Sequence, residues 1–358
     1  MVARLGTAAG PDVAAARGTA ARRALAALLI AGLLLGVTGC TWLRRPPGFT
    51  QVRALGLDPR DPDRVYLATD GGLLVAGPGG RLEPAGAARL DLTALAIAPV
   101  EPWPLYASGR PGPGVDLPDP LGMVVSPDGG RTWTPVGLSG EVRLSHLAVS
   151  PIDPRLVYGW ADPPGQLYHS EDGGATWTAR TAAGVADGVA AGVIGAAMVA
   201  STATDIPGSP AGVSGTPTAL PGAAAEEDNG PPAVALAPHP RARDQLLAAT
   251  PGGLLWSPDR GQRWQTLLAG PVTAVAYSLQ DPQVILAYHR EEGLMESRNG
   301  GRTWTALGLR LPAPDGVAQI AIHPVAPAVV YLTTFRGEVL GSRDGGRTWK
   351  TVVRPGRR

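Results

Sequence analysis

SRDGGRTW, from Ser342 to Trp349, decides the fold, because close variants of these eight residues occur at four other places in the chain. The five copies start 44, 87, 40 and 45 residues apart. A period in the low forties, with several short strands in each repeat, is typical of the four-stranded blades of a β-propeller. The other copies are SPDGGRTW from Ser126, SEDGGATW from Ser170, SPDRGQRW from Ser257 and SRNGGRTW from Ser297.

Each copy has the composition of a tight turn between two strands. Asp carboxylates and Ser hydroxyls accept hydrogen bonds from turn amides, and Gly adopts positive φ at little cost. The Trp that ends each copy would cover the hairpin and pack against the neighbouring layer. We therefore predict a structural role for fifteen residues: Ser126, Asp128, Trp133, Ser170, Asp172, Trp177, Ser257, Asp259, Trp264, Ser297, Asn299, Trp304, Ser342, Asp344 and Trp349.

The same order of short apolar runs precedes each copy. In the last unit these runs cover 318–322, 329–333 and 338–341, and Gly, Pro and Asp separate them, as expected for strands. A further unit without the motif begins near Val52. The sequence thus predicts an all-β propeller of four-stranded blades, each with the motif between its third and fourth strands. Six units are recognisable, at about 51–86, 92–138, 143–180, 232–268, 271–308 and 316–353.

The 87-residue interval between the second and third copies leaves the number of blades open. Residues 182–231 consist largely of Ala, Gly, Pro, Ser and Thr, with no Trp or Tyr. This composition favours a mobile low-complexity insertion, and a degraded seventh blade is the alternative. The predicted organisation is a signal peptide over 1–40, a linker over 41–50 and a propeller over 51–354.

The N-terminal forty residues have the features of an export signal. Arg22 and Arg23 precede an apolar run over 24–37, and Val37-Thr38-Gly39-Cys40 follows. This ending resembles the lipobox of bacterial lipoproteins, which implies cleavage before Cys40 and its lipidation. Cys40 is the single cysteine of the chain. We therefore expect an exported protein, anchored through this lipid to the outer side of the cytoplasmic membrane or to the outer membrane.

The composition also narrows the classes of partner. The formal charge is +1 and only one residue is Lys, so no basic stripe suited to nucleic acid stands out. We expect no nucleic-acid partner, no cofactor and no bound metal, and a monomeric propeller.

The five repeated segments resemble the Asp-box, or bacterial neuraminidase, repeats of sialidases, other glycoside hydrolases, sortilin-type receptors and photosystem II assembly factors. In those families the box lies away from the catalytic or binding centre. The resemblance therefore implies that the repeated Asp residues are structural. It also implies that a ligand would bind on the opposite face of the propeller.

The loops expected on that opposite face contain the candidate ligand-binding residues. Two loops are unusually long, 109–121 and the insertion at 182–231, and elaborated loops on a rigid scaffold commonly bind ligands. A mixed ring of charges there could bind a protein or glycan, and a solvated rim is the alternative. Its residues are Asp70, Arg110, Asp162, His289, Arg290, Glu291 and Arg336.

Catalysis has less support than binding. Sialidases with this kind of repeat carry an Arg-Ile-Pro stretch, which this sequence lacks. Other glycosidases need two suitably spaced carboxylates, for which Asp70, Asp162 and Glu291 are candidates. The sequence favours a non-catalytic binding or assembly scaffold, and a glycoside hydrolase of the sialidase-like class is the alternative.

Overall fold

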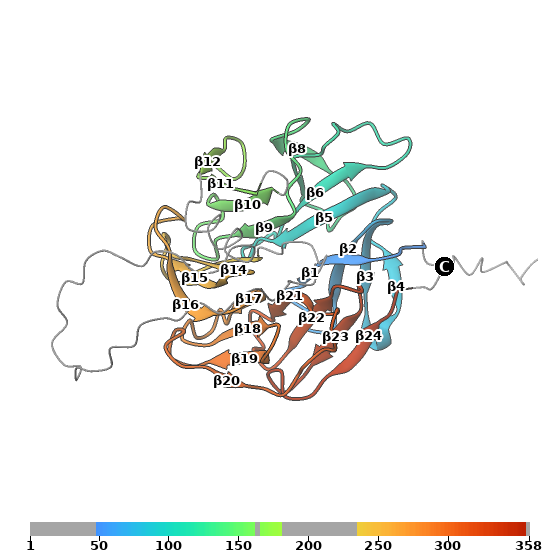
Figure 1. Ribbon diagram of the computed structural model, residues 1–358. Coiled ribbons are helices and arrows are strands. Elements are labelled where there is room, and N and C mark those ends of the chain that lie inside the picture. Colours follow the sequence, from blue (N-terminus) through green and yellow to red (C-terminus); the bar gives the residue numbers. More distant parts are fainter. Residues whose placement is uncertain (1–47, 162–164, 181–234, 356–358) are drawn as a thin grey trace, which may run out of the picture. The chain divides into compact units, whose positions relative to one another are not determined.

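The computed structural model describes residues 48–161, 165–180 and 235–355. These residues form six four-stranded antiparallel sheets in one compact unit, and each sheet uses four consecutive strands. The prediction of an all-β propeller is confirmed (Figure 1). Among these residues, no helix is long and apolar enough to cross a membrane.

The first three blades are meanders of consecutive strands. A single turn of 3-10 helix, Pro78–Gly80, precedes the fourth strand of the first blade. The strands are β1 (Val52–Leu57), β2 (Val65–Thr69), β3 (Gly72–Ala76) and β4 (Leu82–Pro84); β5 (Leu90–Ile97), β6 (Leu105–Pro111), β7 (Met123–Ser126) and β8 (Thr134–Gly137); and β9 (His146–Val149), β10 (Val157–Ala161), β11 (Gln166–Ser170) and β12 (Thr178–Arg180).

The last three blades repeat the pattern. Their strands are β13 (Ala235–Pro238), β14 (Leu246–Thr250), β15 (Gly253–Ser257) and β16 (Gln265–Ala269); β17 (Val272–Tyr277), β18 (Ile285–His289), β19 (Gly293–Ser297) and β20 (Thr305–Ala306); and β21 (Val317–Ile322), β22 (Val330–Thr334), β23 (Val339–Ser342) and β24 (Lys350–Val353).

The first strands of the blades stand next to one another around the ring. β9 of the third blade contacts β13 of the fourth directly, and β1 contacts β21. The described ring therefore closes with six blades. The predicted insertion at 182–231 lies outside the described residues, as do Cys40 and the predicted signal peptide.

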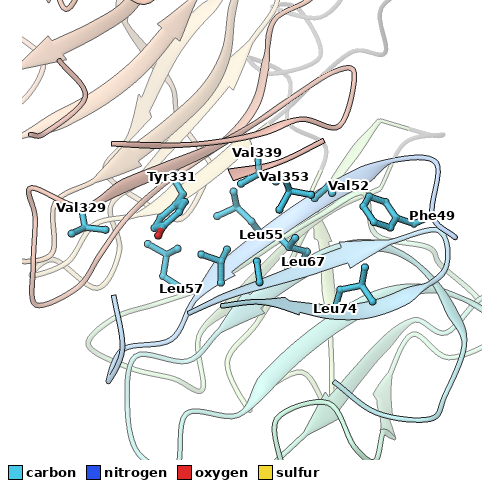
Figure 2. Close-up of a cluster of buried hydrophobic side chains, with 12 residues drawn as sticks. Phe49, Val52, Leu55, Leu57, Leu67, Leu74, Val329, Tyr331, Val339 and Val353 are labelled. Carbon is cyan, nitrogen blue, oxygen red and sulfur yellow. The ribbon is translucent and has the colours of Figure 1, made fainter. Parts of the chain in front are cut away.

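Apolar side chains fill the junctions between blades. The second strands β2, β10, β14, β18 and β22 are buried along their whole length, because neighbouring blades cover both faces of each sheet. At the junction of the last and first blades, Leu55 and Leu67 lie in one cluster with Tyr331 and Val339 (Figure 2). Burial of such clusters contributes about 25 cal/mol per Å² of apolar surface.

Bulges in the first strands direct side chains toward the following blade. The β1–β2 register shifts around Arg53, and its guanidinium pairs with Asp91 of the second blade. Equivalent shifts surround Thr93 and Thr273. Thr93 Oγ1 donates to the carbonyl of Leu144 at 2.7 Å, and Thr273 Oγ1 to that of Val317 at 2.6 Å. Each bulge thus supplies a contact between adjacent blades.

Strand direction divides the loops between two faces. Because neighbouring strands are antiparallel, the turns between first and second strands and those between third and fourth strands share one face. We call the repeated segments starting at Ser126, Ser170, Ser257, Ser297 and Ser342 the box turns, and this side the box face. The second-to-third turns and the connections between blades lie on the opposite face.

Candidate functional site

The box turns are closed by their own side chains. In the third blade, Ser170 Oγ accepts a hydrogen bond from Gly174 N at 2.8 Å and donates to Asp172 Oδ1 at 2.7 Å. The Asp172 carboxylate also accepts from Thr176 N at 2.9 Å and from Thr176 Oγ1 at 2.6 Å. The bonds from Thr176 and Ser170 lower the pKa of Asp172 to about 2. Its lone pairs are engaged within the turn.

The second glycine of a box turn receives a side chain from the preceding blade. Gly174 has φ +96°, and a Cβ atom at this position would overlap the Met123 side chain of β7. Gly130, with φ +92°, meets Leu73 of β3 in the same way. Close packing therefore requires glycine at this position, in addition to the backbone angle. A box turn joins two blades as well as two strands.

On the opposite face, Asp70 fixes the chain that leads into β1. Its Oδ1 accepts from Thr50 N at 2.9 Å and from Gln51 N at 3.4 Å, and its Oδ2 accepts from Thr50 Oγ1. Partial burial alone would raise the pKa of Asp70, but the hydrogen bonds from Thr50 and Gln51 outweigh it and lower the pKa. This carboxylate is therefore held ionised in a local turn.

His289 is buried at the end of β18. The residue is 5% exposed, and its Nε2 lies 3.0 Å from the carbonyl oxygen of Ala269. Its Nδ1 accepts from the backbone N–H groups of Glu291 and Glu292, both at 3.2 Å. Nδ1 thus holds the turn after β18, and Nε2 contacts the preceding blade. Glu291 itself is exposed.

The remaining predicted ligand residues are spread over several blades. The Arg290 guanidinium lies 5.7 Å from the ring centre of Phe335, which joins the fifth and sixth blades. The Arg110 guanidinium is 3.7 Å from the Asp119 carboxylate, and that of Arg336 is 3.9 Å from the Asp315 carboxylate. Asp162 lies outside the described residues. The structure thus brings Arg290 and Phe335 of two blades together. Asp70 and Arg110 instead contact residues of their own blades, Thr50 and Asp119.

Three of the larger cavities lie on the box face or the outer edge next to it. A cavity of about 430 Å³ separates the turns of the first and second blades, and one of about 400 Å³ continues it outward along Arg81. A third, of about 510 Å³, lies between the fifth and sixth blades. Among the described residues, no group of three or more His, Cys, Asp and Glu side chains could hold a metal ion.

The sequence did not predict the cavity between the first and second blades. Its walls include Trp103, which lies in a first-to-second turn and not in a box turn. That position was the one available signal, since the other five blades have no aromatic residue there: they have Asp63, Arg155, Asp244, Gln283 and Ala328. Arg60 and Arg64 belong to the turn between β1 and β2, whereas Arg131 belongs to a box turn of the second blade, so the sequence gave no signal that the three meet.

Comparison with known proteins identifies the fold. No family model and no curated protein matches the chain. A GH74 xyloglucanase from Xanthomonas campestris is 18% identical with a TM-score of 0.51, over 86% of this chain and 45% of the xyloglucanase. YCF48 from Cyanidioschyzon merolae is 18% identical with a TM-score of 0.44, over 85% of both chains. YCF48 bound to D1 peptide is 14% identical with a TM-score of 0.41, over 85% of this chain and 82% of that one.

The similarity to the xyloglucanase agrees with the β-propeller fold that the six sheets define. The chain spans less than half the length of the xyloglucanase chain it matches. At this level of identity the likeness concerns the fold alone.

Proposed function

We propose that this chain is a non-catalytic binding or assembly scaffold, exported and anchored to a membrane through a lipid on Cys40. The observation that supports a scaffold is the state of its carboxylates. A glycosidase needs one carboxylic acid whose pKa is raised, so that it can protonate the leaving group. Wherever a described Asp or Glu has a shifted pKa, the shift is downward: Asp70, Asp128, Asp153, Asp172, Asp259 and Asp344.

The candidate acid-base groups of the opposite face have structural contacts. Asp70 holds the approach to β1. His289 holds the turn after β18 through Nδ1 and contacts Ala269 of the preceding blade through Nε2. Groups fixed in this way serve to shape loops, and they would have to break these contacts to transfer a proton. Exposed charges with no such buried role, such as Glu291 and Arg110, are better suited to contacts with a macromolecule.

The ligand that we propose for this face is a protein or glycan that contacts several blades. Arg110 belongs to the second blade, Glu291 to the fifth and Arg336 to the sixth, and all three are exposed. Residues spread over a rigid ring suit a broad partner, since loops on a scaffold present side chains in fixed positions.

The experiment is chemical crosslinking of the protein in its own membrane, followed by identification of the joined residues. The charge reversals Arg110→Glu and Arg336→Glu should together reduce the crosslinked partner. The matched control Arg302→Glu reverses an exposed charge on the box face and should leave it unchanged. Equal loss in both variants would contradict the proposed face.

The anchor has its own test. Cys40→Ser should release the protein from membranes into the soluble fraction, because a single serine cannot carry the acyl chains. A variant that stays in the membrane fraction would contradict lipid anchoring and leave the binding proposal to the crosslinking result.

A further inference from the structure

A groove on the box face has the features of a ligand site that the proposed scaffold function does not use. It lies between the first and second blades and encloses about 430 Å³, within the range of roughly 300–1,000 Å³ found for small-ligand sites. Its walls bring together the arginines Arg60, Arg64 and Arg131 with the indole of Trp103.

A buried carboxylate positions two of these arginines. Asp58 is 2% exposed, and its Oδ1 lies 3.2 Å from Arg60 Nε and accepts from Arg60 N at 3.1 Å. Its Oδ2 lies 3.7 Å from Arg64 Nε. One buried acid thus orients two guanidiniums toward the same cavity.

Aromatic rings support the same two guanidiniums. The Arg60 guanidinium carbon lies 4.8 Å from the centre of the Trp103 ring, and that of Arg64 lies 5.4 Å from the centre of the Tyr66 ring. Stacking of this kind uses the flat face of a guanidinium. The N–H groups lie at the edge of the guanidinium plane, where they can donate hydrogen bonds to a ligand.

The second carboxylate of the groove is engaged elsewhere. Asp128 Oδ1 accepts from Ser126 Oγ at 2.8 Å, from Arg131 N at 3.0 Å and from Thr132 N at 2.9 Å, and Oδ2 accepts from Thr132 Oγ1 at 2.6 Å. The groove therefore holds three guanidiniums and two carboxylates. Arg60 donates to Asp58 through both Nε and Nη2, and Arg131 Nη1 donates to the carbonyl of Asp128 at 3.4 Å. Each guanidinium carries five N–H groups, so further donors remain for a ligand.

Trp103 has an unfavourable backbone conformation at the edge of this groove. Its φ of +53° lies in the left-handed region, which a bulky residue rarely adopts. Its N–H donates to the carbonyl of Val100 at 2.7 Å, which fixes the turn. Strain in a bulky residue beside a cavity is a common feature of ligand sites.

We propose that this groove binds an acidic saccharide through its carboxylates. Guanidinium groups donate only, and they pair with carboxylates in a planar, two-bond arrangement. A sugar hydroxyl can accept from a guanidinium N–H and turn its own O–H toward water, because the hydroxyl hydrogen rotates, whereas a peptide N–H has a fixed direction. The adjoining cavity of about 400 Å³ shares Arg64 and Arg131, so an oligosaccharide has room to extend beyond the first groove. Its lining also includes Asp61 and Arg81, which pairs with Glu83 at 3.0 Å.

The test is calorimetric titration of the full-length protein with a trimer of galacturonic acid. The neutral trimer of galactose and a short poly-glutamate peptide serve as comparison ligands. Arg131→Gln should weaken binding of the acidic trimer about tenfold or more, because it removes a charged hydrogen-bond donor. Arg302→Gln should change it less than about twofold, since Arg302 occupies the same position in another box turn.

Three outcomes would overturn the proposal: no binding of the acidic trimer, equal binding of the neutral trimer, or equal effects of Arg131→Gln and Arg302→Gln. Tighter binding of the peptide would assign the groove to proteins and would also contradict it. Thermal melts of both variants exclude unfolding as the cause. The crosslinking pattern on the opposite face tests the scaffold separately, because neither arginine lies on that face.

Discussion

Gln319 on β21 bonds both backbone polar groups of Leu55 on β1, although 264 residues separate the two in the chain. Its Oε1 accepts from Leu55 N at 2.7 Å, and its Nε2 donates to Leu55 O at 3.1 Å. Each blade of this ring consists of four consecutive strands, so the last and first blades share no strand where they meet. Side chains such as Gln319 join the last blade to the first.

Loss of this amide should destabilise the ring. Gln319→Leu keeps much of the side-chain volume but leaves the Leu55 N–H and carbonyl without these partners, at a cost of about 1–3 kcal/mol. Urea denaturation measures the free energy of unfolding. The control is Gln280→Leu, which removes one exposed bond to the Pro324 carbonyl and should cost about 0.5 kcal/mol or less. Equal losses would show that Gln319 has no special part in closure.

The two glycines of one box turn separate backbone strain from packing. At Gly173, with φ +80°, an added Cβ would have no other atom within 4 Å, whereas at Gly174 it would overlap Met123. Gly173→Ala should cost about 1 kcal/mol from the left-handed backbone alone. Gly174→Ala should cost about 1–3 kcal/mol more, because the buried Met123 side chain must shift. Similar losses in thermal or urea unfolding would contradict the packing role.

Acid should weaken the box turns in a defined range of pH. Hydrogen bonds from Thr132 and Thr176 lower the pKa values of Asp128 and Asp172 from the ordinary 3.8 to about 2. A carboxylate whose folded pKa is lowered contributes stability above its ordinary pKa, and this contribution is lost as the pH falls through the folded value. The melting temperature should therefore fall between about pH 4 and pH 2.

Asp172→Asn provides the comparison for that measurement. The variant keeps an acceptor, as Asn299 does in the fifth blade, but has no group to protonate. Its melting temperature should depend less on pH over the same range. An unchanged slope would mean that other carboxylates cause the acid sensitivity.

The sequence predicted the strands and turns within each blade. The runs 318–322 and 329–333 correspond to β21 and β22 within one residue at each end, because strand and turn signals lie within one unit of the chain. The motif spacing also predicted the turns between third and fourth strands. A meander of consecutive strands needs no information from distant segments.

Contacts between blades could not be predicted in this way. Nothing near Gln319 indicates that it bonds Leu55, and nothing near Arg131 indicates that it shares a groove with Arg60. His289 illustrates the same limit at the predicted ligand face, because its burial depends on a bond to Ala269 of the preceding blade. Its residue type and charged neighbours predicted a ligand-binding residue at the surface. In the structure its ring is buried by packing against the preceding blade.

Binding without catalysis is the property on which the proposed function depends. The most direct measurement is product release from a panel of aryl-glycosides that includes a sialoside, together with xyloglucan, by the full-length protein. We expect no release above that of heat-denatured protein. Turnover that is abolished by Asp70→Asn or Glu291→Gln would contradict the scaffold proposal and identify a glycoside hydrolase.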